Sequence, residues 1–254
     1  MLVFLGKICQ MIAIRIYGNS FSGVEIENQN ARFLNMGLNR QKALEKLDEL
    51  CLRKFGQQYD EQNGMWSEHL TLMTALSLER DDIKSILEIG TFKGETTALL
   101  AELFPLACIE TIDLEQHEIV KQGIYHYAVD SIEKGREIYR NDKIKFRVMN
   151  SLNLIKEKEK FDLIWVDGSH IHPISIIDIA NSIRLLSTNG VAVCDDVYLK
   201  RNILDQVSDT SSIDTLRAFE KSGIIKFTLM KKRVSKRFNN RLVKPKYLGV
   251  YSLV

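Results

Sequence analysis

The chain has 254 residues, which is enough for one large α/β domain with an added segment. Its composition, 45% hydrophobic and 27% charged, is that of a globular protein and excludes a low-complexity chain. The formal net charge of +2 gives no general indication of a nucleic-acid partner or an acidic membrane. The four cysteines form no C-x-x-C pair, so we expect reduced thiols in a cytoplasmic protein.

Residues 1–18, MLVFLGKICQMIAIRIYG, are largely apolar. No basic stretch precedes the apolar run and no small-residue cleavage site follows it, so a signal peptide is not expected. Lys7 and Arg15 interrupt the run, which is also too short for stable membrane insertion. Its apolar residues recur at helical spacing, so we expect one helix face to pack against this chain or against a second copy in a homo-oligomer. A helix lying on a membrane surface is the alternative.

Two helices are predicted next. The segment Asn39–Phe55 is amphipathic, and Gly56 follows it as a C-terminal stop. A second helix spans Glu68–Leu78. We expect residues 1–80 to form an N-terminal helical cap or oligomerisation segment.

Strands and helices alternate in the remaining residues, 81–254, which we expect to form the catalytic domain. The predicted strands are 85–89, 108–112, 144–149, 161–166 and 190–194, and the predicted helices are 95–104, 129–139, 174–186 and 213–221. This alternation implies an α/β fold with a doubly wound, mostly parallel sheet covered on both faces. A loop rather than a helix separates the last runs, 224–230 and 247–254, so these strands should pair antiparallel.

The first predicted strand leads into LEIGTFKGETT, residues 87–97. Gly90 allows a tight turn, and Gly94 allows the backbone to approach a ligand where the next helix begins. The free amides of that helix start favour a carboxylate or a phosphate. The G-x-x-x-G spacing differs from G-x-G-x-x-G and disfavours a dehydrogenase with a dinucleotide cofactor. Glu88, just before the first glycine, provides a carboxylate that can meet an ammonium group.

Polar side chains also end the next two strands. Asp113 closes the second strand, where an acid can hold both hydroxyls of a ribose. Asn150 and Ser151 close the third strand, where they can contact an adenine. Because the carboxyl ends of parallel strands meet at one edge of a sheet, these residues should line a single nucleotide site.

In this order, the features resemble the core of the S-adenosylmethionine-dependent methyltransferases of the Rossmann-like class, over residues 83–197. The E-x-G-x-x-x-G of residues 88–94 is similar to the first motif of that family. The resemblance implies a seven-stranded sheet with an antiparallel last strand and S-adenosylmethionine as the cofactor. The cofactor-binding residues that we expect are Glu88, Gly90, Thr91, Phe92, Gly94, Thr96, Asp113, Asn150, Ser151 and Asp167.

Three acids follow the fourth and fifth strands. Asp167 lies in DLIWVDGSHIHP, and Asp195 and Asp196 lie in GVAVCDDVY. Neighbouring strands would bring the three carboxylates together, where they would repel one another and lose hydration. A hard divalent cation resolves this conflict, so we predict that Asp167, Asp195 and Asp196 bind Mg²⁺ or Mn²⁺. The alternative is that these acids only cap turns.

The acids and His170 resemble the metal-dependent O-methyltransferases more narrowly. The catechol type has a lysine base three residues after its first acid, whereas the macrocin and mycinamicin sugar type has a histidine there. This sequence has His170 at that position and two acids after the fifth strand, as in the sugar type. The resemblance implies that His170 is the general base and that the acceptor is a small-molecule hydroxyl, on a sugar or a glycosylated metabolite. A neutral imidazole suits that role near neutral pH.

Other functions stay open at this stage. DDVY is weakly similar to the D-P-P-Y of nucleic-acid amino-methyltransferases, but that motif belongs after the fourth strand, where this chain has DGSH; we therefore expect no nucleic-acid partner. A metal-independent methyltransferase with another acceptor and a non-catalytic S-adenosylmethionine-binding subunit are the remaining alternatives. The basic run of residues 231–246, KKRVSKRFNNRLVKPK, is either a solvated loop or a contact for an anionic acceptor.

Overall fold

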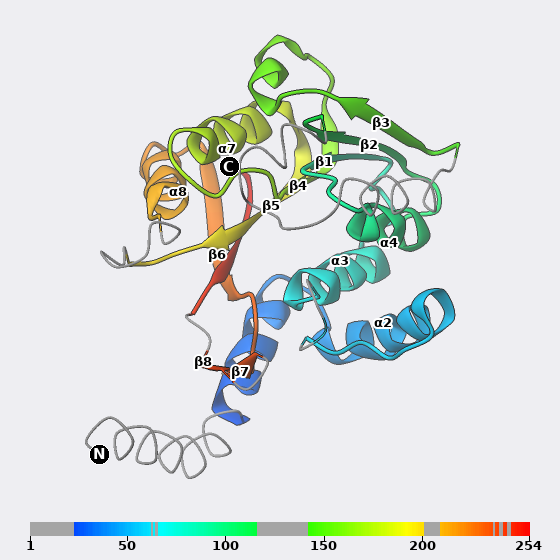
Figure 1. The fold of residues 1–254 in the computed structure, drawn as a ribbon. Helices are drawn as coiled ribbons and strands as arrows, with labels where there is room; N and C mark the ends of the chain where they lie inside the picture. The colour runs from blue at the N-terminus through cyan, green and yellow to red at the C-terminus, as the bar shows by residue number, and fades with distance from the viewer. Residues whose placement is uncertain are drawn as a thin grey trace, which may run out of the picture. The chain divides into compact units, whose positions relative to one another are not determined.

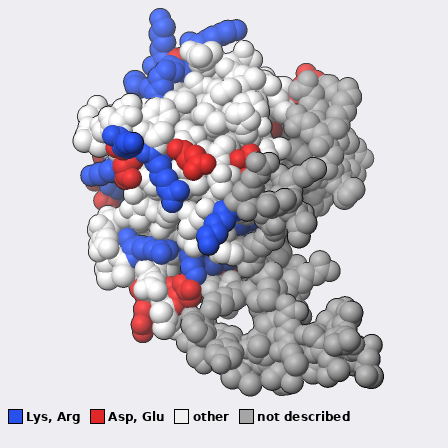
Figure 2. Space-filling view, turned by 90° about the vertical axis from the view of Figure 1, so that its left-hand side faces the viewer, with Lys and Arg blue, Asp and Glu red and all other residues white. Residues whose placement is uncertain are grey.

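A computed structural model describes residues 23–61, 63, 66–115, 142–200, 209–235, 237–238, 241–242 and 245–254. The predicted helices near the N-terminus and over 129–139 lie outside these residues, as do parts of the basic run. Among the described residues, no helix is both long and apolar enough to cross a membrane. On the face in Figure 2, cationic and anionic side chains are interspersed over much of the described surface, as the small net charge would suggest.

The chain divides into two compact units. The first comprises residues 1–75 and 231–245, and the second comprises residues 76–230 and 246–254. Most of the basic run therefore belongs with the N-terminal unit, although the sequence analysis placed it in the catalytic domain. Its last residue, Lys246, belongs to the second unit.

The first unit contains a helix over residues 23–35, helix α2 (Arg40–Phe55) and the start of α3 (Glu68–Glu79). Asn39 caps α2 by accepting a hydrogen bond from the Lys42 amide, and Gly56 ends it in the left-handed conformation. Arg40 and Glu68 form a largely buried ion pair at 2.6 Å. The two-stranded sheet of β7 (Arg237–Phe238) and β8 (Arg241–Leu242) also belongs to this unit.

The second unit is built on a seven-stranded sheet with the order β3-β2-β1-β4-β5-β9-β6. Its strands are β1 (Ser85–Ile89), β2 (Cys108–Asp113), β3 (Ile144–Val148), β4 (Phe161–Val166), β5 (Leu186–Val197), β6 (Ile225–Lys231) and β9 (Tyr247–Leu253). The pairs from β3 through β5 are parallel, and β9 is antiparallel to β5. The predicted fold class is confirmed.

Helices cover both faces of this sheet. Helices α7 (Ile174–Leu185) and α8 (Ser211–Lys221) lie on one side, and α4 (Glu95–Leu103) lies on the other (Figure 1). The central strand β4 is therefore buried on both faces, and its Leu163, Ile164 and Trp165 are 0% exposed. A continuous apolar run suits such a strand, since neither face meets water. The edge strand β3, by contrast, has mostly exposed or half-buried residues.

Candidate active site

The predicted site residues lie at the carboxyl ends of the parallel strands. Gly90 follows β1, Asp113 ends β2, Asn150 follows β3 and Asp167 follows β4. Asp195 lies near the end of β5. In an open α/β sheet this edge is where ligands bind. The strand order places β1 between β2 and β4, so the glycine loop lies between the tips that carry Asp113 and Asp167.

Gly90 allows β1 and β4 to approach closely. Its φ is +98°, and an added Cβ would lie 2.2 Å from the Asp167 carbonyl oxygen. The Asp167 amide also donates a 2.8 Å hydrogen bond to the carbonyl of Ile89, the residue before Gly90. Only glycine meets both the backbone conformation and the close approach, so Gly90 fixes where Asp167 leaves the sheet.

The loop after Gly90 is tied to the end of β2 by Asp113. One oxygen of this carboxylate accepts a 2.7 Å hydrogen bond from the Phe92 amide, and the other accepts one of 2.8 Å from the Leu114 amide. Phe92 has a φ of +47°, and Gly94 begins α4 in the left-handed conformation. Asp113 therefore stabilises an unusual loop conformation at the end of β2.

Glu88 lies beneath this loop and is 0% exposed. Its Oε2 accepts hydrogen bonds from the hydroxyls of Thr97 and Thr111, while Oε1 has no hydrogen-bond partner among the described residues. Burial raises the pKa of Glu88 to about 7, although the two hydroxyls oppose this shift. Thr111 also bonds Thr91 at 2.6 Å, so the buried carboxylate links the loop to β2 and α4.

The residues predicted to contact an adenine have local contacts. The Asn150 side chain accepts a hydrogen bond from the Leu152 amide and caps the short 3-10 helix η1 (Ser151–Lys156). Asn150 is exposed, and Ser151 and Thr96 are half-buried. Neither oxygen of the buried Asp178 of α7 has a hydrogen-bond partner among the described residues. Burial raises the pKa of this carboxyl to about 6, and the Ser151 side chain opposes part of that rise.

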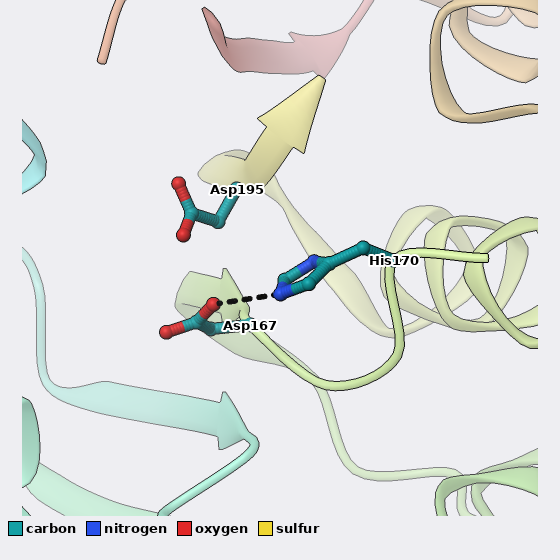
Figure 3. Close-up of side chains that lie close together, drawn as sticks. All are labelled: Asp167, His170 and Asp195. Carbon is teal, nitrogen blue, oxygen red and sulfur yellow. Dashed lines mark ion pairs between the residues drawn. The ribbon is translucent and has the colours of Figure 1, made fainter. Parts of the chain in front are cut away.

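Asp167, His170 and Asp195 come together at the tips of β4 and β5. Each offers a ligand atom, and these atoms all lie within 4.8 Å of one another. His170 Nε2 is 3.6 Å from Asp167 Oδ1 and 3.9 Å from Asp196 Oδ2. Figure 3 shows the imidazole of His170 directed towards Asp167, with the Asp195 carboxylate on the same side. His170 and Asp167 are partly exposed, so a ligand can reach them.

A β-bulge explains how two consecutive acids reach one site. In the pairing of β5 with β9, Cys194 lies opposite Gly249 and Val197 lies opposite Tyr247. Asp195 and Asp196 of β5 therefore together oppose a single residue of β9. Asp196 has a φ of +50°, which breaks the normal alternation of side chains along the strand. Both carboxylates therefore lie near His170 instead of on opposite faces of the sheet.

Lys246 is a neighbour that the sequence did not single out. Its Nζ lies 2.6 Å from Asp196 Oδ2 and 5.4 Å from the centre of the Tyr198 ring. Asp196, a predicted metal ligand, is therefore paired with a lysine in this structure, whereas His170 joins Asp167 and Asp195. Thr97, Thr111 and Asp178 were likewise not predicted, because nothing in a single sequence separates them from other polar residues of strands and helices.

The donor set fits a divalent cation. Two carboxylates and an imidazole whose ligand atoms lie within 4.8 Å of one another suit Mn²⁺ and other transition metals, and the oxygens alone suit Mg²⁺. The loop of Gly90–Gly94 also fits a cofactor, since it lies at the carboxyl ends of the strands beside the Asp113 carboxylate, which binds the Phe92 amide.

The comparison with protein families addresses the identity of this site. Residues 87–197 match a family described as a methyltransferase domain. Over these residues the chain is similar to a methyltransferase domain. The match runs from the end of β1 through β5 and includes every expected site residue. The resemblance to the S-adenosylmethionine-dependent methyltransferases is confirmed, and a dehydrogenase is set aside. No curated protein sequence matches the chain.

Solved structures of methyltransferases share the fold of this chain. The O-methyltransferase TomG from Streptomyces achromogenes, in complex with SAM, is 18% identical with a TM-score of 0.52, over 90% of this chain and 98% of its own. The Bacillus cereus O-methyltransferase in complex with SAH is 17% identical, with a TM-score of 0.50, and the match covers 84% of this chain and 91% of that chain. The N-methyltransferase NodS from Bradyrhizobium japonicum is 18% identical, with a TM-score of 0.50, and the match covers 73% of this chain and 94% of that chain. Oxygen and nitrogen methyltransferases match equally well, so the fold does not decide the acceptor atom.

Proposed function

We propose that the chain is an S-adenosylmethionine-dependent O-methyltransferase that acts on a hydroxyl of a small molecule, a sugar or a glycosylated metabolite. The observation that carries this proposal is the position of His170. Its Nε2 lies 3.6 Å from Asp167 and 3.9 Å from Asp196, at the strand ends beside the glycine loop. A base among carboxylates at this edge suits the removal of a proton from a weakly acidic hydroxyl.

The residues that would hold S-adenosylmethionine follow the strand tips. The backbone of Gly90–Gly94 and the start of α4 would receive the amino-acid part, with Glu88 supporting the loop from beneath. Asp113 would hold the ribose hydroxyls, and Asn150 and Ser151 would lie at the adenine. S-adenosylmethionine supplies an electrophilic methyl group on a sulfonium.

Asp167, Asp195 and Asp196 would hold Mg²⁺ or Mn²⁺, with His170 beside them. A bound divalent cation supplies Lewis-acid chemistry that makes an acceptor hydroxyl more acidic. The carboxylates would also orient His170, since both Asp167 and Asp196 face its Nε2. The resemblance to the sugar-type enzymes supports this set of ligands.

His170 would take the proton in the reaction. The acceptor oxygen forms a bond to the methyl carbon as the carbon–sulfur bond breaks, and its proton passes to His170 Nε2. The sulfur leaves as a neutral thioether, and the imidazolium next to Asp167 and Asp196 is stabilised by their negative charges. Holding the nucleophile and the methyl group in line supplies much of the remaining acceleration.

A second function is favoured by the ion pair between Lys246 and Asp196. An ammonium that already neutralises one of the three acids suits a methyltransferase that uses no metal. His170 would act as the base in this case too. The cytoplasmic location, the homo-oligomer and the boundary near residue 80 stay predictions.

The experiment that tests the proposal is a transfer assay with radiolabelled S-adenosylmethionine and a panel of sugars and vicinal diols. It is run with Mg²⁺ and then with EDTA. His170→Gln should lose at least about a hundredfold in rate, since general-base catalysis contributes that much. His172→Gln is the matched control and should keep its rate, because His172 is exposed. Equal rates in both variants would overturn the role of His170, and full activity in EDTA would favour the metal-independent function.

A further inference from the structure

Three acids and one lysine share the tips of β4, β5 and β9. Asp195 and Asp196 are 3% and 7% exposed, so little water screens their charges. Asp196 Oδ2 is 2.6 Å from Lys246 Nζ and 3.9 Å from His170 Nε2. The lysine ammonium and the His170 imidazole therefore both lie close to the same oxygen of Asp196.

The position of Lys246 is set by strand pairing. Lys246 directly precedes β9, and the next residue, Tyr247, pairs with Val197 of β5. The bulge that directs Asp196 to the site lies immediately beside this pair. The register of the two strands thus places the lysine next to Asp196, and the Tyr198 ring lies 5.4 Å from the ammonium. The backbone is fixed, while the side chain has four flexible carbons.

The ammonium does for Asp196 what a divalent cation would do. Three neighbouring carboxylates repel one another, and a positive charge in contact with one of them reduces that repulsion. An oxygen that accepts from Lys246 at 2.6 Å has less capacity for a metal ion, and the ammonium charge also repels that ion.

We propose that Lys246 is a built-in competitor for the divalent cation, which occupies Asp196 until a metal ion displaces it. This inference rests on the proposed function, since it assumes that the acids bind a metal. It follows that Asp167 and Asp195 form the primary cation site and that Asp196 becomes a ligand only when Lys246 moves away, while His170 stays beside the metal as the base. Metal affinity is then weaker than the three acids alone would give.

The test measures binding of Mn²⁺ alone, by electron paramagnetic resonance of the free ion, and needs no acceptor. Lys246→Met keeps the apolar stem and removes the charge, and it should bind Mn²⁺ at least about tenfold more tightly than the wild type. Lys221→Met, at the exposed end of α8, loses the same charge away from the strand tips and should leave the affinity unchanged. Lys246→Gln serves as a second variant if the first fails to fold.

A double-mutant cycle separates competition for Asp196 from a general charge effect. In an Asp196→Asn background, Lys246→Met should raise the Mn²⁺ affinity less than about threefold, because the carboxylate for which the lysine and the metal compete is gone. A full gain in that background, or no gain from Lys246→Met alone, would overturn the inference while metal binding itself stands. Failure of all variants, the wild type included, to bind Mn²⁺ would refute the metal part of the proposed function and the inference with it.

Discussion

Replacing Gly90 by alanine tests how the site is built. The new Cβ would lie 2.2 Å from the Asp167 carbonyl oxygen and 2.7 Å from its carbon, whereas Cβ atoms essentially never come within 3.0 Å of other atoms. Both contacts are with backbone, so no side chain can rotate away. The φ of +98° adds strain of about 1–2 kcal/mol, and overpacking adds about 1–3 kcal/mol. We expect a loss of about 2–5 kcal/mol in unfolding free energy.

Gly223→Ala is the matched control for this substitution. Gly223 lies in the same unit with a φ of +69°, but nothing lies within 4 Å of an added Cβ, so only the conformational strain applies. Urea unfolding of both variants and the wild type gives the two losses. If Gly90→Ala loses no more unfolding free energy than Gly223→Ala does, β1 and β4 do not approach as closely as the structure shows, and the placement of Asp167 is wrong.

Three further predictions concern buried polar groups. The pKa of Asp178 is raised in the folded protein to about 6 from an ordinary 3.8. Between these two pH values the folded state therefore keeps a proton that the unfolded state has lost. Stability should fall by about 3 kcal/mol as pH rises from about 4 to about 6, and Asp178→Asn should remove this loss in urea titrations across that range. Thr111→Val should cost about 1.5–3 kcal/mol in unfolding free energy, because Glu88 loses a buried donor. Arg40→Met should cost about 3–5 kcal/mol by the same measurement, because it leaves the buried Glu68 charge unpaired.

Each of these predictions has an outcome that contradicts it. An unchanged pH slope in Asp178→Asn would show that the carboxyl does not titrate as described. A Thr111→Val loss near zero would mean that Thr97 alone satisfies Glu88. If adding Glu68→Leu to Arg40→Met recovers no stability, the unpaired charge is not the cause of the loss.

The sequence was sufficient for the sheet because buried strands have simple patterns. SILEI and FDLIWV are largely apolar runs, each with one acid, and β1 and β4 have the predicted bounds, Ser85–Ile89 and Phe161–Val166. β5 was predicted as 190–194 but spans Leu186–Val197. The strand continues through two acids because the bulge directs both to the site, and no local pattern indicates a bulge whose cause is the pairing with β9.

The site was predictable only where a residue type alone indicates its role. Gly90 and Asp113 follow from the strand-end rule, because their chemistry does not depend on distant partners. Lys246 and Asp196 are 50 residues apart, and their contact depends on the register of β5 and β9. That Glu88 meets a ligand stays a prediction, and its partners Thr97 and Thr111, which come from two other elements, were not predicted. Such contacts are tertiary, and a single sequence carries no signal for them.

The most direct test of the central claim is a calorimetric titration of S-adenosylhomocysteine into the purified protein with Mg²⁺ present. The account predicts a micromolar dissociation constant for the wild type and at least about tenfold weaker binding for Asp113→Asn, which loses a charged acceptor at the end of β2. Asp214→Asn, an exposed acid on α8, should bind as the wild type does. No binding by a wild-type protein shown to be folded would contradict the methyltransferase site at these strand tips.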